Sequence, residues 1–341
     1  MSGSINGLNL AIGGLAAVVV TPFMPRAMAK IGAAELLALA LVIAAAALIA
    51  IYAIPSLWLW FPVRFVLSSA LNALFVIAEY WISRLANESN RGRYIALYSL
   101  CFAGGFGIGP ALLQVTGTNG IAPFAAGAVL LLAAIAPVMF ARRAAPRIEQ
   151  AFTTSVVSVV RAAPAAFAAA FVFGAVDAGM AGLIPVYAMR SGYTEAHAAL
   201  CVTAMALGSI MFQYPIGALA DRTSRRHLLA LCAATGIVGA ALTPLAVQTP
   251  YLLYLLLFVW GGLILGIYTI GLMLLGEHFC DADLANANAS FVILYSLGLL
   301  LGPLGEGVAL DAWNPDGLML SLGLICAVYM GFLLAQRPEE G

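Results

Sequence analysis

The sequence predicts an all-α polytopic membrane protein that crosses the bilayer about eleven times, in two helical bundles of five and six spans. Of its 341 residues, 63% are hydrophobic and only 9% are charged, and the mean hydropathy is +1.02. Soluble domains are roughly 45–50% apolar and about 25% charged. The second observation is a series of apolar runs of about 20 residues, the length that a helix needs to cross about 30 Å of hydrocarbon. The third is a repeat between the two halves of the chain.

The apolar runs give the predicted spans and the domain boundaries. They lie at about 5–25, 34–54, 57–80, 94–115, 121–141, 164–188, 196–220, 227–247, 251–275, 287–310 and 317–335. The first run lacks the basic start of a signal peptide and is therefore interpreted as a span. The long connection predicts an N-terminal bundle over 1–144, a cytoplasmic linker over 145–163 and a C-terminal bundle over 164–341. Apolar residues at 148–159 share one helical face, so we expect this part of the linker to lie on the membrane.

Basic residues predict the orientation, because loops rich in Lys and Arg stay in the cytoplasm. All of the 15 basic residues except Arg64 and Arg190 fall on alternate loops that share one side. We therefore expect a cytoplasmic carboxyl terminus and, with an odd number of spans, an external amino terminus. The formal net charge is zero, which gives no electrostatic basis for binding nucleic acid.

The repeat relates the two halves at an offset of roughly 192–199 residues, as in transporters built from two similar bundles. LANESNRGRYIALYSL (85–100) parallels LANANASFVILYSL (284–297), and a glutamate, Glu79 or Glu277, precedes each copy. The offset leaves the span at 164–188 without a counterpart. The sequence therefore predicts a six-plus-six design that lacks its first helix.

The segment GALADRTSRR (217–226) places a glycine, an acid and paired arginines directly after an apolar run. It resembles the loop signature of the major facilitator superfamily, although Ser224 stands where that family usually has glycine. EYWISRLANESNRGRYIALYS (79–99) is similar to the YcaD-like bacterial branch of the superfamily. The resemblance implies a major-facilitator-like two-bundle fold, rocker-switch alternating access, a monomer and a multi-pass location in a bacterial inner membrane.

We interpret this segment as part of a cytoplasmic gate. A small residue lets a neighbouring helix approach, and an acid can face the positive end of that helix and hold the arginines. Glu79 and Glu277 are expected to reach the basic inner loops near Arg84 or Arg222. The predicted gate comprises Gly217, Asp221, Arg222, Arg225, Arg226, Glu79 and Glu277. A basic loop that only anchors a helix end is the alternative.

Three charged residues inside spans are candidates for the substrate and proton pathway, because a charge at the bilayer centre costs about 3 kcal/mol. Asp177 lies near the middle of its span, beside a face of small residues, and is the candidate proton carrier; a structural acid is the alternative. Arg64 is a candidate for binding an anionic substrate or for neutralising Asp177, or it forms a buried ion pair. Glu306 is a second protonatable site or an acid in a wet outer vestibule.

Polar and small residues complete the predicted sites. Asn72, Trp260, Tyr268 and Thr269 either line the cavity or form hydrogen bonds between helices. GGFGIGP (104–110) resembles the glycine-proline signature of the superfamily's antiporters, without its trailing glycine pair; no strand or ribose-binding acid follows, so it is not a dinucleotide site. Glycine and proline at these spacings predict close-packed, bendable helices. The helix-packing residues are Gly105, Gly109, Pro110, Gly298, Gly302 and Pro303.

Together these observations predict a secondary transporter for a small, partly hydrophobic compound, with proton-coupled efflux by antiport. The alternatives are a sugar or organic-acid importer and a truncated, non-transporting membrane protein. An enzyme is not expected, because no nucleophile elbow, HExxH motif or paired aspartates are present. The five cysteines and three histidines have no metal-like spacing, so neither a metal nor a cofactor is predicted.

Overall fold

The computed structural model describes residues 2–85, 115–145, 160–279 and 281–335, with a few residues of 101–113. Within these residues ten helical segments are long and apolar enough to cross a membrane. They correspond to ten of the predicted spans, and the remaining one, 94–115, lies largely outside the described residues, as does the linker segment 146–159. The prediction of an all-α polytopic membrane protein is confirmed.

Among the described residues, the first half of the chain contains six α-helices and two short 3-10 helices. α1 (Gly3–Val20) continues through η1 (Thr21–Phe23) into α2 (Met24–Ile31). A turn at Gly32 leads into α3 (Ala33–Ala53). The backbone φ of Gly32 is 98°, a value that residues other than glycine rarely adopt. The following elements are α4 (Leu57–Leu85), α6 (Ala122–Ala133), α7 (Ile135–Phe140) and η2 (Arg142–Ala144).

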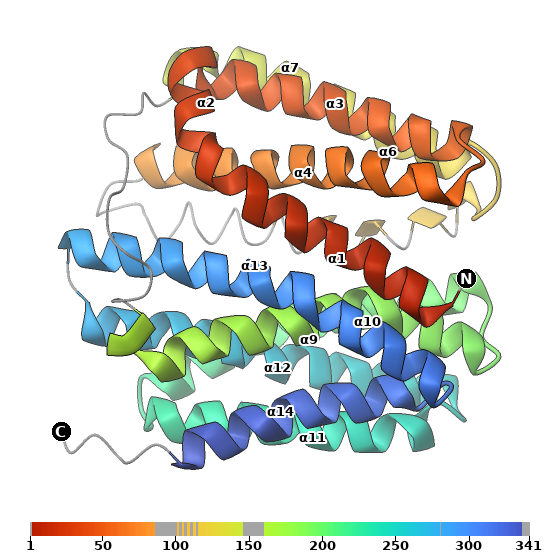
Figure 1. Cartoon of the computed structure of the whole chain (residues 1–341), viewed down its shortest axis with the longest axis vertical. Helices are drawn as coiled ribbons and strands as arrows, with labels where there is room; N and C mark the ends of the chain where they lie inside the picture. Colours follow the sequence, from red (N-terminus) through yellow and green to blue (C-terminus); the bar gives the residue numbers. More distant parts are fainter. Residues whose placement is uncertain are drawn as a thin grey trace. The chain divides into compact units, whose positions relative to one another are not determined.

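The described residues from Pro164 to Ala335 contain six helices, which Figure 1 shows running side by side. They are α9 (Pro164–Arg190), α10 (Glu195–Ala220), α11 (Arg225–Ala246), α12 (Pro250–His278), α13 (Asp281–Ala312) and α14 (Gly317–Ala335). Proline occupies the first position of α9 and α12, where its missing N–H has no intrahelical partner to lose. α13 begins at Asp281, whereas the predicted span begins at 287. The first residues of α13 are helical but polar, and the apolar segment that could cross the membrane is Ser290–Ala312.

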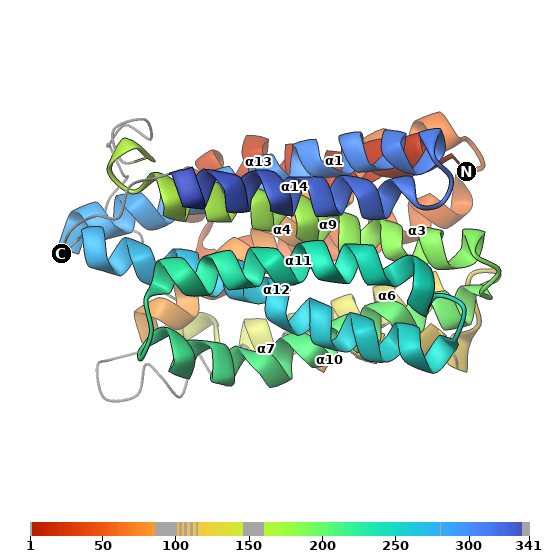
Figure 2. The same cartoon turned by 90° about the horizontal axis from the view of Figure 1, so that it is seen from below.

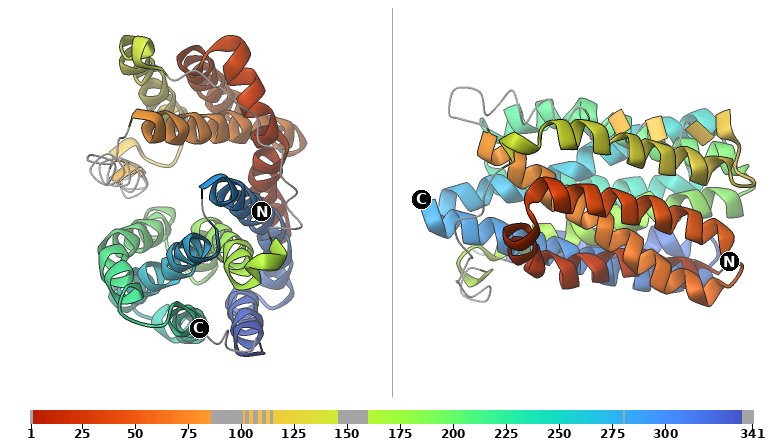
Figure 3. Two further views of the ribbon diagram at one scale, coloured as in Figure 1. Left: turned by 90° about the vertical axis from the view of Figure 1, so that its left-hand side faces the viewer. Right: turned by 90° about the horizontal axis from the view of Figure 1, so that it is seen from above.

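The chain divides into two compact units. Unit 1 comprises Met1–Ala11, Phe106–Ala111 and Thr153–Gly341, and unit 2 comprises Ile12–Gly105 and Leu112–Phe152. Viewed end-on, α9–α14 surround a common core (Figure 3). Large, fully buried side chains fill that core, among them Trp260, Tyr187, Tyr329, Phe167 and Phe291. The buried core of unit 2 consists mainly of alanine and leucine from α3 and α4.

Within unit 1, α9 and α13 pack backbone against backbone through glycine. A Cβ atom on Gly174 would lie 2.2 Å from the carbonyl oxygen of Tyr295, and one on Gly298 would lie 2.1 Å from that of Phe171. A Cβ atom on Gly302 would lie 2.5 Å from Cα of Ala175. Only glycine permits so close an approach, and this contact sets the position of the site described below.

The first turn of α1 is capped by a carboxylate from α13. Asp311 accepts hydrogen bonds from the backbone N–H groups of Gly3 (2.6 Å) and Ser4 (2.7 Å) and from the Ser4 hydroxyl (2.7 Å). Arg190 also donates to Asp311, at 2.7 Å. The free N–H groups at the start of α1 are therefore satisfied by an acid held by a cation.

Candidate functional site

The candidate site is centred on Asp177, in the middle of α9. The hydroxyl of Tyr295, on α13, donates a hydrogen bond to Oδ2 of Asp177 at 2.9 Å. Gly174 lies one turn before Asp177 and faces the backbone of Tyr295. The absence of a side chain at Gly174 brings the two helices close enough for this pair to form. Asp177 is half-buried, and the Tyr295 phenol holds its carboxylate in place.

Four aromatic rings from three helices, that of Tyr295 among them, pack together at this pair. Phe173 stacks on Tyr295 with the ring centroids 5.9 Å apart. Tyr268 of α12 lies 5.3 Å from Phe173, 5.2 Å from Phe291 and 5.6 Å from Tyr295. We call these four residues the aromatic cluster. Their faces carry partial negative charge, so a cluster beside a carboxylate suits a flat, apolar or cationic molecule.

Glu306, on α13, is fully buried at 0% exposure. Neither of its carboxyl oxygens has a hydrogen-bond partner among the described residues. Its Oε2 atom lies 2.0 Å from where a Cβ atom on Gly179 would stand, so the carboxyl group occupies the space that this glycine of α9 leaves open. A buried carboxyl without partners is costly when ionised. One alternative from the sequence placed Glu306 in a water-filled outer vestibule, and the complete burial of its side chain contradicts that alternative.

Arg64 and Asn72 lie on α4 in unit 2 and are described within that unit only. Arg64 is partly buried, and its Nε atom is buried without a hydrogen-bond partner in the described part of the chain. Asn72 donates a hydrogen bond to the hydroxyl of Thr21, at 2.9 Å. The Asn72 side chain therefore joins two helical segments, one of the two roles that the sequence left open.

Trp260 and Tyr268 lie on α12 but in different surroundings. Trp260 is 1% exposed and packs against Gly239 of α11, where a Cβ atom would lie 2.5 Å from its ring. It is a core residue of unit 1 in this structure. Tyr268 is only partly buried and belongs to the aromatic cluster, so of these two predicted pathway residues it is the one beside Asp177. The Thr269 hydroxyl donates to the carbonyl oxygen of Leu265 in its own helix.

The predicted gate residues of unit 1 gather at the end of the unit that carries the basic residues. Arg225 forms an ion pair with Glu277 at 2.7 Å and donates to the carbonyl oxygen of Met273 at 3.0 Å. Arg226 donates to the carbonyl oxygen of Leu333 at 3.2 Å. These residues line a cavity of about 880 Å³ between the ends of α9, α11, α12 and α14. Glu277 thus meets Arg225, whereas the sequence favoured Arg84 or Arg222.

Other gate and packing residues make fewer contacts. Asp221 and Arg222 are exposed, and Asp221 forms no ion pair within the described residues. The described residues leave open space around Gly217, Gly105 and Gly109. Pro110 and the side chains of Glu79 and Arg84 lie outside the described part of the chain. Gly298 and Gly302 are in the α9–α13 contact, and the carbonyl of Pro303 lies 2.0 Å from where a Cβ atom on Gly7 would stand.

Sequence reasoning identified Asp177 and Tyr268 but missed the residues that surround them. Tyr295, Phe173 and Phe291 are ordinary aromatic residues in apolar runs, with no local feature that separates them from core residues. A signal for Tyr295 was present in the repeat, because LYSL at 294–297 matches LYSL at 97–100. Within the described residues, no group of three His, Cys, Asp or Glu side chains is placed to hold a metal ion.

Comparisons with known proteins agree with this architecture. A family model described as Major Facilitator Superfamily matches residues 1–200 and 167–341. The MFS-type transporter YfkF of Bacillus subtilis (strain 168) is 27% identical over 346 residues, spanning 99% of this chain and 88% of YfkF. The MFS-type transporter YcaD of Escherichia coli O9:H4 (strain HS) is 25% identical, spanning 81% of this chain and 72% of YcaD. The crystal structure of the nucleoside transporter NupG matches with a TM-score of 0.73 at 16% identity, covering 98% of this chain and 88% of NupG.

Proposed function

The chain belongs to the Major Facilitator Superfamily, in its YcaD-like branch, and on that premise we propose that it exports a small, partly hydrophobic compound in exchange for protons. Members of this family are multi-pass membrane transporters and not enzymes, so the substrate passes through unchanged. In the proposed cycle the two helical bundles rock about a central site that opens to one side of the membrane at a time. In this proposal Asp177 and the aromatic cluster, both within unit 1, bind the substrate and the proton.

The observation that carries this proposal is the hydrogen bond from Tyr295 to Asp177 inside the aromatic cluster. The two partly exposed rings of the cluster, Tyr268 and Tyr295, supply apolar surface and negative faces for a flat or cationic molecule. The carboxylate supplies the one group there that changes charge when it takes up a proton. A proton and a cationic substrate therefore compete for Asp177, and this competition is sufficient for exchange.

Tyr295 stabilises the ionised form of Asp177 by donating to it. When Asp177 is protonated, the attraction for a cationic substrate is lost and the substrate can leave. When Asp177 releases its proton to the cytoplasmic side, the negative charge returns and the next substrate binds. Protons then enter the cell down their gradient while the substrate moves out.

Substrates can be found by ligand-dependent thermal stabilisation of the purified protein, with a panel of aromatic, cationic and anionic compounds at two pH values. The decisive variant is Asp177→Asn in proteoliposomes with an imposed pH gradient and a compound from that panel. We expect transport driven by the pH gradient to disappear, with binding of cationic compounds weakened and binding of neutral aromatic compounds still detectable. Glu195→Gln, at an exposed acid of α10, is the matched control and is expected to transport normally.

The opposite result would refute the proton assignment: Asp177→Asn retaining normal coupling to the gradient. Failure of the wild-type protein to move any compound that stabilises it would favour the non-transporting alternative. Size-exclusion chromatography with light scattering tests the prediction of a monomer in the same samples.

A second candidate, uptake of an organic acid or sugar, is favoured by Arg64. Its buried Nε atom lacks a protein partner among the described residues, and a guanidinium group binds carboxylates well. On this alternative, Arg64→Ala abolishes uptake of anionic compounds and leaves neutral ones unaffected. Arg64→Lys, which keeps the charge without the planar fork, is expected to restore part of the uptake. Equal loss for all compounds would indicate a structural role for Arg64.

A further inference from the structure

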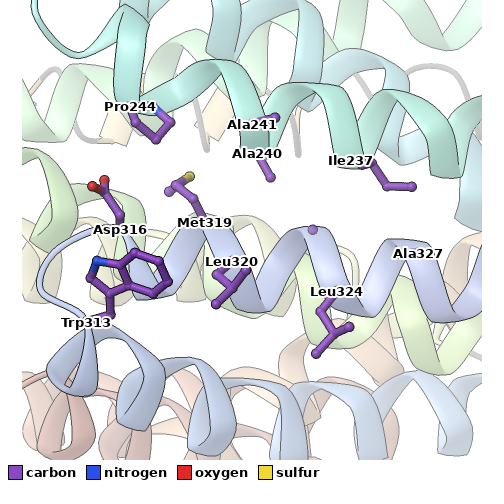
Figure 4. A pocket seen from close by; sticks show the side chains of 11 residues that line it. Ile237, Ala240, Ala241, Pro244, Trp313, Asp316, Met319, Leu320, Leu324 and Ala327 are labelled. Carbon is purple, nitrogen blue, oxygen red and sulfur yellow. The ribbon is translucent and has the colours of Figure 1, made fainter.

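A groove lies between α11 and α14 in unit 1, apart from Asp177 and the aromatic cluster. Its volume is about 430 Å³, which is within the roughly 300–1,000 Å³ range of ligand pockets. Figure 4 shows Ala241 and Pro244 on one wall and Met319 and Leu324 on the other. Leu320 and Leu324 are 59% and 62% exposed at its border. Figure 2 shows α11 and α14 as neighbours along most of their length.

One end of the groove differs chemically from the rest. Asp316 and Trp313 lie there, at the turn between α13 and α14 (Figure 4). Oδ1 of Asp316 accepts a hydrogen bond from Tyr187 at 3.0 Å. The described residues provide no partner for Oδ2. Trp313 is 64% exposed, which is typical of tryptophan at the boundary between lipid and water.

The length of the groove corresponds to one leaflet of a bilayer. From Asp316 to Ala327 the helical rise is about 16 Å, close to half of the roughly 30 Å of hydrocarbon. The groove therefore starts at the membrane surface, at the end of the unit that the distribution of basic residues predicts to be external. It continues with apolar walls to about the middle of the bilayer.

The charge at the groove favours a cation. No basic residue lines it, and Arg190, the basic residue on that side, is bonded to Asp311 at 2.7 Å and to Asn314 at 2.9 Å. Within the described residues no ion pair neutralises Asp316, and one of its oxygens is left for a donor. An ammonium group hydrogen-bonds to a carboxylate, whereas an anionic headgroup is repelled.

We propose that the groove between α11 and α14 binds one phospholipid with an ammonium headgroup, phosphatidylethanolamine, from the leaflet that meets the α13–α14 turn. Its acyl chain lies along Ala241, Met319, Gly323 and Ala327. Its ammonium group hydrogen-bonds to Oδ2 of Asp316. Phosphatidylcholine, whose trimethylammonium group cannot donate a hydrogen bond, binds less well, and anionic phosphatidylglycerol binds least.

Native mass spectrometry of the purified protein tests this, with phosphatidylethanolamine, phosphatidylcholine and phosphatidylglycerol of identical acyl chains in an equal mixture. We expect the wild type to retain phosphatidylethanolamine about fivefold more than phosphatidylcholine. Asp316→Asn should remove that preference, and Glu195→Gln, at an exposed acid outside the groove, should keep it. Melting temperatures show whether each variant is folded.

A second pair of variants tests the apolar part. Ala241→Phe fills the groove and should lower the retained phosphatidylethanolamine about tenfold. Val238→Phe, at a position of the same helix that is 54% exposed and does not line the groove, should retain it. Three results would each overturn the proposal: equal retention of all three lipids by the wild type, preference for phosphatidylglycerol, or undiminished retention by folded Ala241→Phe.

Discussion

Unit 1 and unit 2 carry different chemistry, although the sequence predicts that the two halves of the chain repeat one design. In α9 of unit 1, 67% of the residues in an 18-residue apolar stretch are buried, and this helix holds Asp177 against Tyr295. The segment Ala122–Phe140 in unit 2 has a higher mean hydropathy, 2.2 against 1.8 for α9. Only 6% of its apolar stretch is buried, however. Hydropathy reports that a helix can enter lipid, and it does not report whether that helix forms the centre or the rim of a bundle.

The two units also differ in the burial and the hydrogen-bond partners of the charged residues inside their spans. Unit 1 contains Asp177, bonded to a phenol, and Glu306, buried on a glycine. Unit 2 contains Arg64, with a buried Nε atom that lacks a partner in the described residues. The charged pathway candidates inside the predicted spans are therefore acids in unit 1 and a guanidinium group in unit 2, so the two units differ in electrostatics.

The largest expected effect comes from the glycine contact of unit 1. In Gly298→Ala the new Cβ atom would meet the carbonyl oxygen of Phe171 at 2.1 Å, so the backbones of α9 and α13 must separate. We expect a loss of about 3 kcal/mol in stability, measured as a large drop in melting temperature. Gly127→Ala is the matched variant in unit 2, where Cβ meets only the flexible end of Leu48 at 3.2 Å. Equal effects of the two would contradict the difference in packing.

The cap on α1 is expected to give the next largest effect. Asp311→Asn loses the charge that Arg190 and the first N–H groups of α1 share. A loss of about 2 kcal/mol follows from replacing charge-assisted hydrogen bonds by neutral ones. Thermal unfolding in detergent measures it, with Glu195→Gln as the control at an exposed acid. An unchanged melting temperature would show that the cap does not contribute to stability.

Asn72 provides a smaller test, in unit 2. Asn72→Leu removes the hydrogen bond to Thr21, and hydrogen bonds between membrane helices are worth about 0.6 kcal/mol on average. We therefore expect a drop of a few degrees or less in melting temperature. Asn72→Leu leaving stability unchanged but reducing transport would instead assign Asn72 to the substrate pathway.

The smallest effect is expected at the ion pair of Arg225 and Glu277. Its side chains are 23% and 49% exposed, and such pairs contribute about 0–1 kcal/mol. Glu277→Gln should therefore change the melting temperature very little. Glu79→Gln is the matched variant, because Glu79 is the counterpart of Glu277 in the repeat. Similar transport defects in both variants would support a gate shared by the two halves, and a defect in only one would separate their roles.

The candidate site was partly predictable from the sequence. Asp177 stood out because an acid in an apolar run is costly wherever the helix lies. Tyr268 stood out as a polar ring in a span. Tyr295 did not, because an aromatic residue in an apolar run has the same local pattern whether it fills a core or donates to an acid. The partner of Asp177 is 118 residues away along the chain, and no local pattern encodes that distance.

The sequence alone determined that the chain is helical and membrane-embedded, how its spans are spaced and that its halves repeat. Those properties depend on hydrophobicity and periodicity over about 20 residues, which are local quantities. Tertiary structure alone decided that Glu277 pairs with Arg225, that Glu306 packs on Gly179 and that a groove opens beside Asp316. These contacts depend on which helix faces approach one another, and that is set by packing across the whole unit.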